Sequence, residues 1–282
     1  MTRVDAATAG AVRRDPPLPS ALELGMSRAA VELRMFFRER DQVIFTFSFP
    51  IVLLVLFGSI FADAYEGTPI TVSQVYTAGL IGAGVMSTSF QNLGISIAVE
   101  RDQGTLKRLA GTPMPRSSYF IGKIVSVLVI ALLEVVILLA VGVFLYDLEL
   151  PAEAARWAVF AWVFLLGVSG AALLGIAASS LPRSARSATA VITMPFVVLQ
   201  FISGVFIPFT ELPGWLIDIA SLFPLKWMCQ GFRSVFLGDA GAVLEITGSY
   251  ELTRVALVLA AWAVGGLILC LTTFRWKRRG EG

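Results

Sequence analysis

Residues 124–146 read IVSVLVIALLEVVILLAVGVFLY, a stretch in which Glu134 is the only charged residue. A helix needs about 20 predominantly apolar residues to cross a hydrocarbon core of roughly 30 Å. Backbone N–H and C=O groups find no water in that core, so a run this apolar must be helical to satisfy them. The stretch therefore predicts a helix that crosses a membrane.

Five similar runs lie before and after this stretch, and together the six set the fold class. The expected spans are residues 43–62, 75–98, 124–146, 157–181, 188–209 and 255–274. Hydrophobic residues make up 56% of the chain and charged residues 15%, whereas a soluble domain carries about 25% charged residues. We expect an all-α integral membrane protein with a six-span domain at residues 43–274.

Lysine and arginine are unevenly divided among the segments outside these runs. Of the 22 Lys and Arg residues, 18 lie in residues 1–42, 99–123, 182–187 and 275–282, and these segments alternate with three others that hold four. Lys and Arg favour the cytoplasmic side of a membrane. The sequence therefore predicts a multi-pass protein of the plasma (cell) membrane with both termini in the cytoplasm, which agrees with an even number of spans.

Polar segments flank the six-span domain. Residues 1–20, which have no apolar core for a cleavable signal peptide, are expected to form a flexible cytoplasmic tail, and residues 275–282 a basic one. Residues 21–41 place apolar side chains near one helical face and most Glu and Arg elsewhere. This predicts an amphipathic helix in the inner membrane interface, with its arginines near anionic head groups. It serves either as an anchor or in coupling.

Glu134 lies close to the middle of its span. A charged side chain at that depth costs about 2.5–3.5 kcal/mol on insertion scales, and such residues face the bundle interior or a wet cavity. Two interpretations stay open, a protonated or hydrogen-bonded glutamate that joins helices and a substrate or proton site. Gln91, Asn92 and Gln200 are its candidate polar partners.

The segment after the fifth span has a different pattern. Residues 209–237 are rich in apolar and aromatic side chains, but Pro213 and Pro224 interrupt them before any run is long enough to span. We expect short, broken helices that dip into the outer leaflet between spans 5 and 6.

Two stretches resemble a known family. Residues 100–115 read ERDQGTLKRLAGTPMP and resemble the cytoplasmic loop of type-2 ATP-binding-cassette (ABC) exporter permeases. Residues 203–208 (SGVFIP), 212–215 (LPGW) and 223–225 (FPL) resemble the segment that this family carries between its fifth and sixth spans. The resemblance covers roughly residues 20–275 and is closest to drug-resistance permeases of the daunorubicin-exporter kind.

The resemblance implies an ATP-driven exporter. Two permease chains, as a homodimer or heterodimer, would form the pathway, and two separate ATPase subunits would dock on the cytoplasmic side. The ATPase-coupling helix would comprise Glu100, Arg101, Gly104, Thr105, Leu106, Arg108 and Leu109. The extracellular cap would include Phe206, Pro208, Leu212, Pro213, Trp215 and Pro224. Our hypothesis is that Glu100 and Arg101 contact the ATPase while Leu106 and Leu109 anchor the helix.

The motor is expected on another polypeptide. The sequence contains no G-x-x-x-x-G-K-[ST] phosphate loop, so we expect no enzymatic activity and no cofactor in this chain, with ATP and Mg²⁺ bound by the ATPase subunit. The other expected partners are membrane lipid and the second permease chain, and no nucleic acid. The absence of histidine argues against common zinc chemistry.

Several alternatives stay open for the function. The favoured substrate is a hydrophobic or amphiphilic compound such as a drug or antibiotic, and the alternative within the family is a lipid-linked sugar or polysaccharide. An ion-driven transporter or a channel is the alternative from another class. A serine protease is disfavoured, because the G-x-S-G pattern at residues 167–170 has no histidine and no intramembrane lysine to act as its base.

Overall fold

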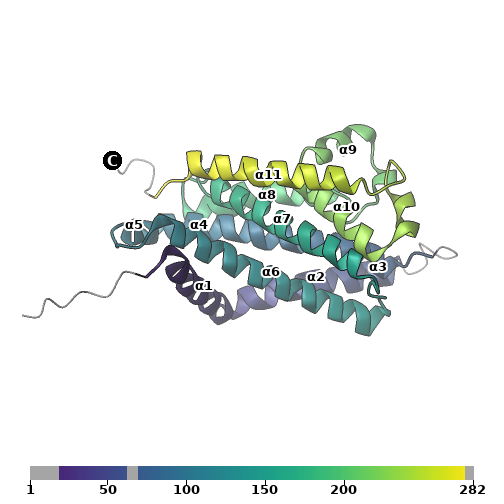
Figure 1. The fold of residues 1–282 in the computed structure, drawn as a ribbon, viewed down its shortest axis with the longest axis horizontal. Helices are drawn as coiled ribbons and strands as arrows, with labels where there is room; N and C mark the ends of the chain where they lie inside the picture. Colours follow the sequence, from purple (N-terminus) through teal and green to yellow (C-terminus); the bar gives the residue numbers. More distant parts are fainter. Residues whose placement is uncertain (1–18, 62–68, 277–282) are drawn as a thin grey trace, which may run out of the picture.

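The computed structural model describes residues 19–61 and 69–276, and every regular element in these ranges is helical. The helices run mostly along the long axis of an elongated bundle (Figure 1). The expected tails at 1–20 and 275–282 lie outside the described residues, apart from residues 19–20 and 275–276. Residue 62, the last of the first expected span, also lies outside them.

Five of the described helices are long and apolar enough to cross a membrane, and the chain is a multi-pass membrane protein. They are α2 (Arg40–Ile60), α6 (Arg116–Tyr146), α7 (Ala154–Ala178), α8 (Ala185–Ile202) and α11 (Leu252–Thr273). Most begin a few residues before the apolar run that predicted them, because polar residues also join the first turn.

Two of these helices differ more from expectation. Helix α6 begins at Arg116 rather than at residue 124, because its first turns pack Ser118, Tyr119 and Lys123 against neighbouring helices and bury them. Helix α8 ends at Ile202 rather than at residue 209, and the chain then leaves the helix in a turn that precedes Pro208. The apolar run alone therefore does not locate a helix end that packs against other parts of the protein instead of lipid.

Residues 75–98, expected as one span, are divided. Helix α3 (Val72–Met86) passes into the π-helix η1 (Ser87–Asn92), which passes directly into α4 (Leu93–Asp102). A π-helix pairs residues i and i+5 and occurs mostly as short bulges at functional sites. The three elements follow one another without a loop, although no continuous α-helix covers the expected span.

The expected amphipathic helix is α1 (Ala21–Arg38), which ends before residue 41. Ser20 and Glu23 form a capping box at its start, with each side chain bonded to the other residue's backbone N–H. The helix packs along the beginning of α6, where the Ser118 hydroxyl donates to the carbonyl oxygen of Ala21 at 2.9 Å. Apolar side chains such as Leu22 and Phe37 are exposed on its outer side, as expected of a helix at a membrane interface.

The segment between α8 and α11 contains four short elements. They are the 3-10 turn η2 (Phe209–Glu211), α9 (Gly214–Ser221), α10 (Pro224–Phe236) and the 3-10 turn η3 (Asp239–Leu244). Helix α10 is buried along nearly its whole length and packs against α3, α7 and α11. In Figure 1, α9 and α10 lie toward one end of the bundle and α5 (Thr105–Ala110) and α1 toward the other.

Candidate functional site

Glu134 on α6 faces the junction between α3 and η1. Its side chain is almost fully buried, with 6% of the residue exposed. Its Oε2 atom accepts a hydrogen bond from the Thr88 hydroxyl at 2.8 Å. Its Oε1 atom packs so closely on Gly84 that a Cβ at that position would overlap it. Gly84 and Thr88, one turn apart on the same side of the helix, therefore form the seat of this carboxyl group.

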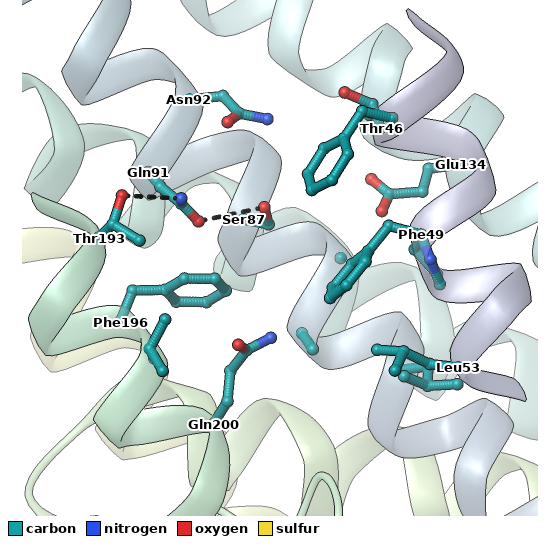
Figure 2. A pocket seen from close by; sticks show the side chains of 16 residues that line it. Thr46, Phe49, Leu53, Ser87, Gln91, Asn92, Glu134, Thr193, Phe196 and Gln200 are labelled. Carbon is teal, nitrogen blue, oxygen red and sulfur yellow. Dashed lines mark hydrogen bonds between the residues drawn. The ribbon is translucent and has the colours of Figure 1, made fainter. Parts of the chain in front are cut away.

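A cavity of about 190 Å³ lies beside Glu134. We call it the central pocket. Its walls come from α2, α3, η1, α6 and α8, and the side chains labelled in Figure 2 are Thr46, Phe49, Leu53, Ser87, Gln91, Asn92, Glu134, Thr193, Phe196 and Gln200. Gln91 Nε2 donates to Thr193 Oγ1 at 3.0 Å, and this hydrogen bond joins η1 to α8.

The central pocket combines an apolar entrance with an interior that holds both apolar and polar side chains. Glu134 points into the cavity from the α6 wall, across from Phe196 and Gln200 (Figure 2). Among the described residues that line the pocket, Glu134 is the only titratable one. Phe45 and Phe49 on α2 also line the pocket and are 66% and 42% exposed. The pocket therefore opens toward the outer surface of the chain between α2 and α8.

The sequence pointed to part of this site. Gln91, Asn92 and Gln200 do line the same cavity as Glu134, but the hydrogen bond to Glu134 comes from Thr88, which the sequence did not single out. Thr88 carries no charge, and a threonine in an apolar run is common. The signal that could have identified Thr88 was its position four residues after Gly84. A glycine on that side of the helix leaves space for a side chain from a neighbouring helix.

The expected coupling helix over Glu100–Leu109 consists of two helices. Helix α4 ends at Asp102, Gly104 has a left-handed φ of +74°, and α5 begins at Thr105. A left-handed residue cannot continue an α-helix, and glycine adopts it without steric cost. Within α5, Leu106 is fully buried and Leu109 is half-buried.

Glu100 faces the interior of the chain. Its Oε1 atom lies 2.5 Å from Lys123 Nζ on α6, and its Oε2 atom accepts from the Tyr119 hydroxyl at 2.9 Å. Lys123 Nζ also lies 2.9 Å from Glu32 Oε2 on α1, and Glu32 is paired in turn with Arg28. We call Arg28, Glu32, Glu100 and Lys123 the inner ion cluster. It joins α1, α4 and α6 through buried charge-assisted hydrogen bonds.

Arg101 also faces inward. Its guanidinium donates to the carbonyl oxygen of Ser179 at 2.5 Å, to the Ser179 hydroxyl at 3.1 Å and to the carbonyl oxygen of Arg275 at 2.8 Å. Arginine stays protonated in proteins, so Arg101 is a charged link from α4 to the ends of α7 and α11.

These contacts differ from our hypothesis for Glu100 and Arg101. Both side chains are engaged within the chain, so neither is directed at the surface where a second protein would bind. The exposed side chains around the α4–α5 turn are instead Gln103, Lys107 and Arg108. The distant partners, Lys123 and Ser179, could not be identified from the local pattern of residues 100–109.

The expected cap residues occupy the segment that follows α8. Phe206 and Pro208 precede η2, Leu212 and Pro213 precede α9, Trp215 is exposed on α9, and Pro224 is the buried first residue of α10. The segment is held by a buried ion pair that the sequence did not reveal. Arg233 Nε on α10 lies 2.6 Å from Glu245 Oε1, and Arg233 Nη1 donates to the Gly204 carbonyl oxygen at 3.1 Å.

Comparison with known proteins identifies the family. Residues 29–237 match the family described as ABC-2 type transporter. The chain is 30% identical over 146 residues to the probable multidrug ABC transporter permease YbhR of Escherichia coli. The aligned residues make up 52% of this chain and 39% of YbhR. This chain is 28% identical over 194 residues to the putative transport permease ycf38 of Porphyra purpurea, covering 66% of this chain and 65% of that protein.

A further relative matches over more of its length. The inner membrane transport permease YadH of Escherichia coli is 24% identical over 222 residues, which covers 76% of this chain and 85% of YadH. The family match spans most of the bundle, from within α1 to the end of α10, and includes the central pocket and, of the inner ion cluster, Glu32, Glu100 and Lys123. The chain therefore belongs to the ABC-2 type transporter family and is a permease component of such a transporter.

Proposed function

We propose that this chain is the transmembrane permease subunit of an ATP-driven exporter that crosses the plasma membrane six times. The five long helices supply five crossings, and α3, η1 and α4 together supply the sixth. Two observations support a sixth crossing. Helix α3, η1 and α4 follow one another without a loop, and residues 75–98 are apolar. The distribution of Lys and Arg then places both termini, α1 and α5 in or at the cytoplasm.

The substrate pathway is formed between two copies of the permease or between this chain and a similar one. The observation that carries this proposal is the central pocket, which places amide, hydroxyl and carboxyl groups behind an apolar entrance between α2 and α8. Both helices expose large apolar side chains, among them Ile44 and Phe45 on α2 and Met194 and Phe201 on α8. A second chain that covers these faces would enclose the pocket away from lipid.

The pocket favours a hydrophobic or amphiphilic substrate of the drug or antibiotic kind. Ligand sites are mostly apolar cavities with a few placed polar groups, and the central pocket has this composition. The printed name of YbhR, a probable multidrug permease, is consistent with such a substrate.

ABC transporter permeases pair with ATPase subunits, and the α4–α5 turn is where we place this contact. The ATPase subunit would bind ATP and Mg²⁺ and would contact the exposed side chains of Gln103, Lys107 and Arg108. Closure of the ATPase would push on α5, which Leu106 anchors to the bundle, and α4 would carry the displacement to η1 and the pocket. At the other end of the bundle, the segment from Phe206 to Phe236 would close the pathway on the outside.

The test is ATP-dependent transport by the two subunits together. The chain is co-expressed with a candidate phosphate-loop ATPase subunit, and inverted membrane vesicles are assayed for ATP-dependent uptake of a panel of amphiphilic dyes and antibiotics. Uptake that requires both subunits is expected. Uptake or ion current that this chain supports without the ATPase would contradict the proposal and favour an ion-driven transporter or a channel.

The orientation is tested separately with single cysteines. Gln103→Cys lies at the proposed cytoplasmic turn and Thr247→Cys in the proposed outer segment, and both positions are exposed. The native Cys229 and Cys270 are buried, so they should contribute little background. In intact cells an impermeant maleimide should label only the cysteine at position 247. Labelling at position 103 alone would reverse the proposed topology.

A further inference from the structure

The carboxyl group of Glu134 is incompletely satisfied within the chain. A carboxylate offers about four acceptor sites, and the one hydrogen bond that the described residues supply comes from the neutral hydroxyl of Thr88. No Lys or Arg among the described residues is ion-paired with Glu134. An ionised carboxylate that is removed from water without a cation carries a large energetic cost. A ligand that brings a positive charge would reduce that cost.

The groups around Glu134 suit the same kind of ligand. Phe45 and Phe49 stand with their rings stacked at 5.3 Å between centroids, and Phe196 lines the opposite wall. The negative faces of aromatic rings attract cations, most strongly where water is excluded. The amides of Asn92 and Gln200 also line the cavity and hydrogen-bond to no other described residue. Their amide oxygens are therefore able to face the positive charge of a ligand.

The size of the cavity limits which part of a ligand enters. An apolar cavity of about 150 Å³ holds one benzene molecule, and the central pocket measures about 190 Å³. It therefore accommodates a charged head with one ring or a short chain. The remainder of a larger molecule would have to extend past Phe45 and Phe49 to the exposed apolar faces of α2 and α8.

We propose that the central pocket binds the charged head of a cationic amphiphile, with the carboxylate of Glu134 as its counter-ion. Thr88 and Gly84 hold the carboxylate in place, and the aromatic side chains surround the cation. This inference rests on the proposed export of amphiphilic compounds and specifies their charge. A neutral or anionic amphiphile of the same shape would leave Glu134 without its counter-ion.

The experiment compares two ligands that differ in charge. The permease with its ATPase is reconstituted in nanodiscs, and binding of radiolabelled benzyldodecyldimethylammonium and of uncharged N-benzyl-N-methyldodecanamide is measured by equilibrium dialysis. The first compound is charged at every pH, so its charge state is the same in all measurements. Glu134→Gln should weaken binding of the ammonium compound on the order of 30-fold, as expected for the loss of a desolvated charge partner. Binding of the amide should change by less than about threefold.

Two further variants make the result specific. Glu134→Asp keeps the charge and should bind the ammonium compound more tightly than Glu134→Gln does. Glu149→Gln removes the same charge from an exposed position outside the pocket and should leave both affinities unchanged. If the Gln variant folds poorly, Glu134→Ala, which also removes the charge, takes its place in both comparisons.

The outcomes separate this inference from the proposed function. If the wild-type transporter binds both compounds and Glu134→Gln weakens both equally or neither, Glu134 is not a counter-ion, while export of amphiphiles stands. If the wild type binds neither compound and neither stimulates its ATP hydrolysis, both the inference and the proposed substrate class are wrong.

Discussion

The inner ion cluster and the central pocket both contain buried carboxyl groups, but the chain treats them differently. In the cluster, Glu32 and Glu100 share the ammonium group of Lys123, and Arg28 adds a second cation. In the pocket, the partner that the described residues supply to Glu134 is the neutral hydroxyl of Thr88, and none of their cations is paired with it. The comparison teaches that charge compensated within the chain fixes helices to one another, whereas charge left open beside a cavity is suited to a ligand.

The largest effect on stability is expected at the centre of the inner ion cluster. Lys123→Met removes the cation that the buried carboxylate of Glu32 shares with the partly buried carboxylate of Glu100, and removing one partner of a buried ion pair costs about 3–5 kcal/mol. We expect a much lower melting temperature of the purified protein in detergent. Lys107→Met, at an exposed position, should change stability by less than about 0.5 kcal/mol.

A compensated variant sharpens this result. Adding Glu100→Gln to Lys123→Met removes the uncompensated carboxylate, leaves Glu32 paired with Arg28, and should recover much of the lost stability. A double variant that is less stable than the single one would show that the cluster acts through the shape of its side chains rather than through charge.

An intermediate effect is expected in the seat of Glu134. Gly84→Ala would place a Cβ against Oε1 of Glu134, and overpacking of this kind costs about 1–3 kcal/mol. The better helix propensity of alanine offsets up to about 1 kcal/mol, so we expect a net loss of about 1 kcal/mol in thermal unfolding. Gly265→Ala on α11, where a Cβ meets no other atom, is the control and should be neutral or stabilising.

The double variant Gly84→Ala with Glu134→Ala isolates the contact. If the Cβ destabilises by pressing on the carboxyl group, the two substitutions together should be less harmful than the sum of their separate effects. If the two effects on stability simply add, the Cβ at position 84 does not act by pressing on the carboxyl group of Glu134.

The smallest effect on stability, but a large effect on coupling, is expected at α5. Lys107→Glu with Arg108→Glu reverses two exposed charges and should shift the free energy of unfolding by less than about 0.5 kcal/mol. If these residues contact the ATPase, substrate-stimulated ATP hydrolysis should fall about tenfold in the reconstituted transporter, equivalent to about 1.4 kcal/mol of lost interaction. If the double variant keeps both its stability and its substrate-stimulated ATP hydrolysis, α5 is not the surface to which the ATPase binds.

The sequence predicted the helical membrane fold because lipid imposes a simple rule on backbone hydrogen bonds. Glu134 stood out for the same reason, as a charge within an apolar run. The π-helix η1 could not be predicted, because a single wider turn leaves no periodic pattern in six residues. The inward direction of Glu100 was also hidden, because its partners Lys123 and Tyr119 belong to another helix and their pairing depends on how α1, α4 and α6 pack.

The π-helix in the pocket wall has a consequence for how this chain tolerates changes in length. Deleting one residue from a regular helix turns everything beyond it by about 100° relative to what precedes it. A π turn already holds an additional residue, so deleting one residue between 87 and 92 could be absorbed by a return to α-helical winding. The side chains facing the cavity would change while Glu100, further along, kept its orientation toward α6. A one-residue deletion at η1 would then alter what is recognised without disturbing the inner end of the bundle.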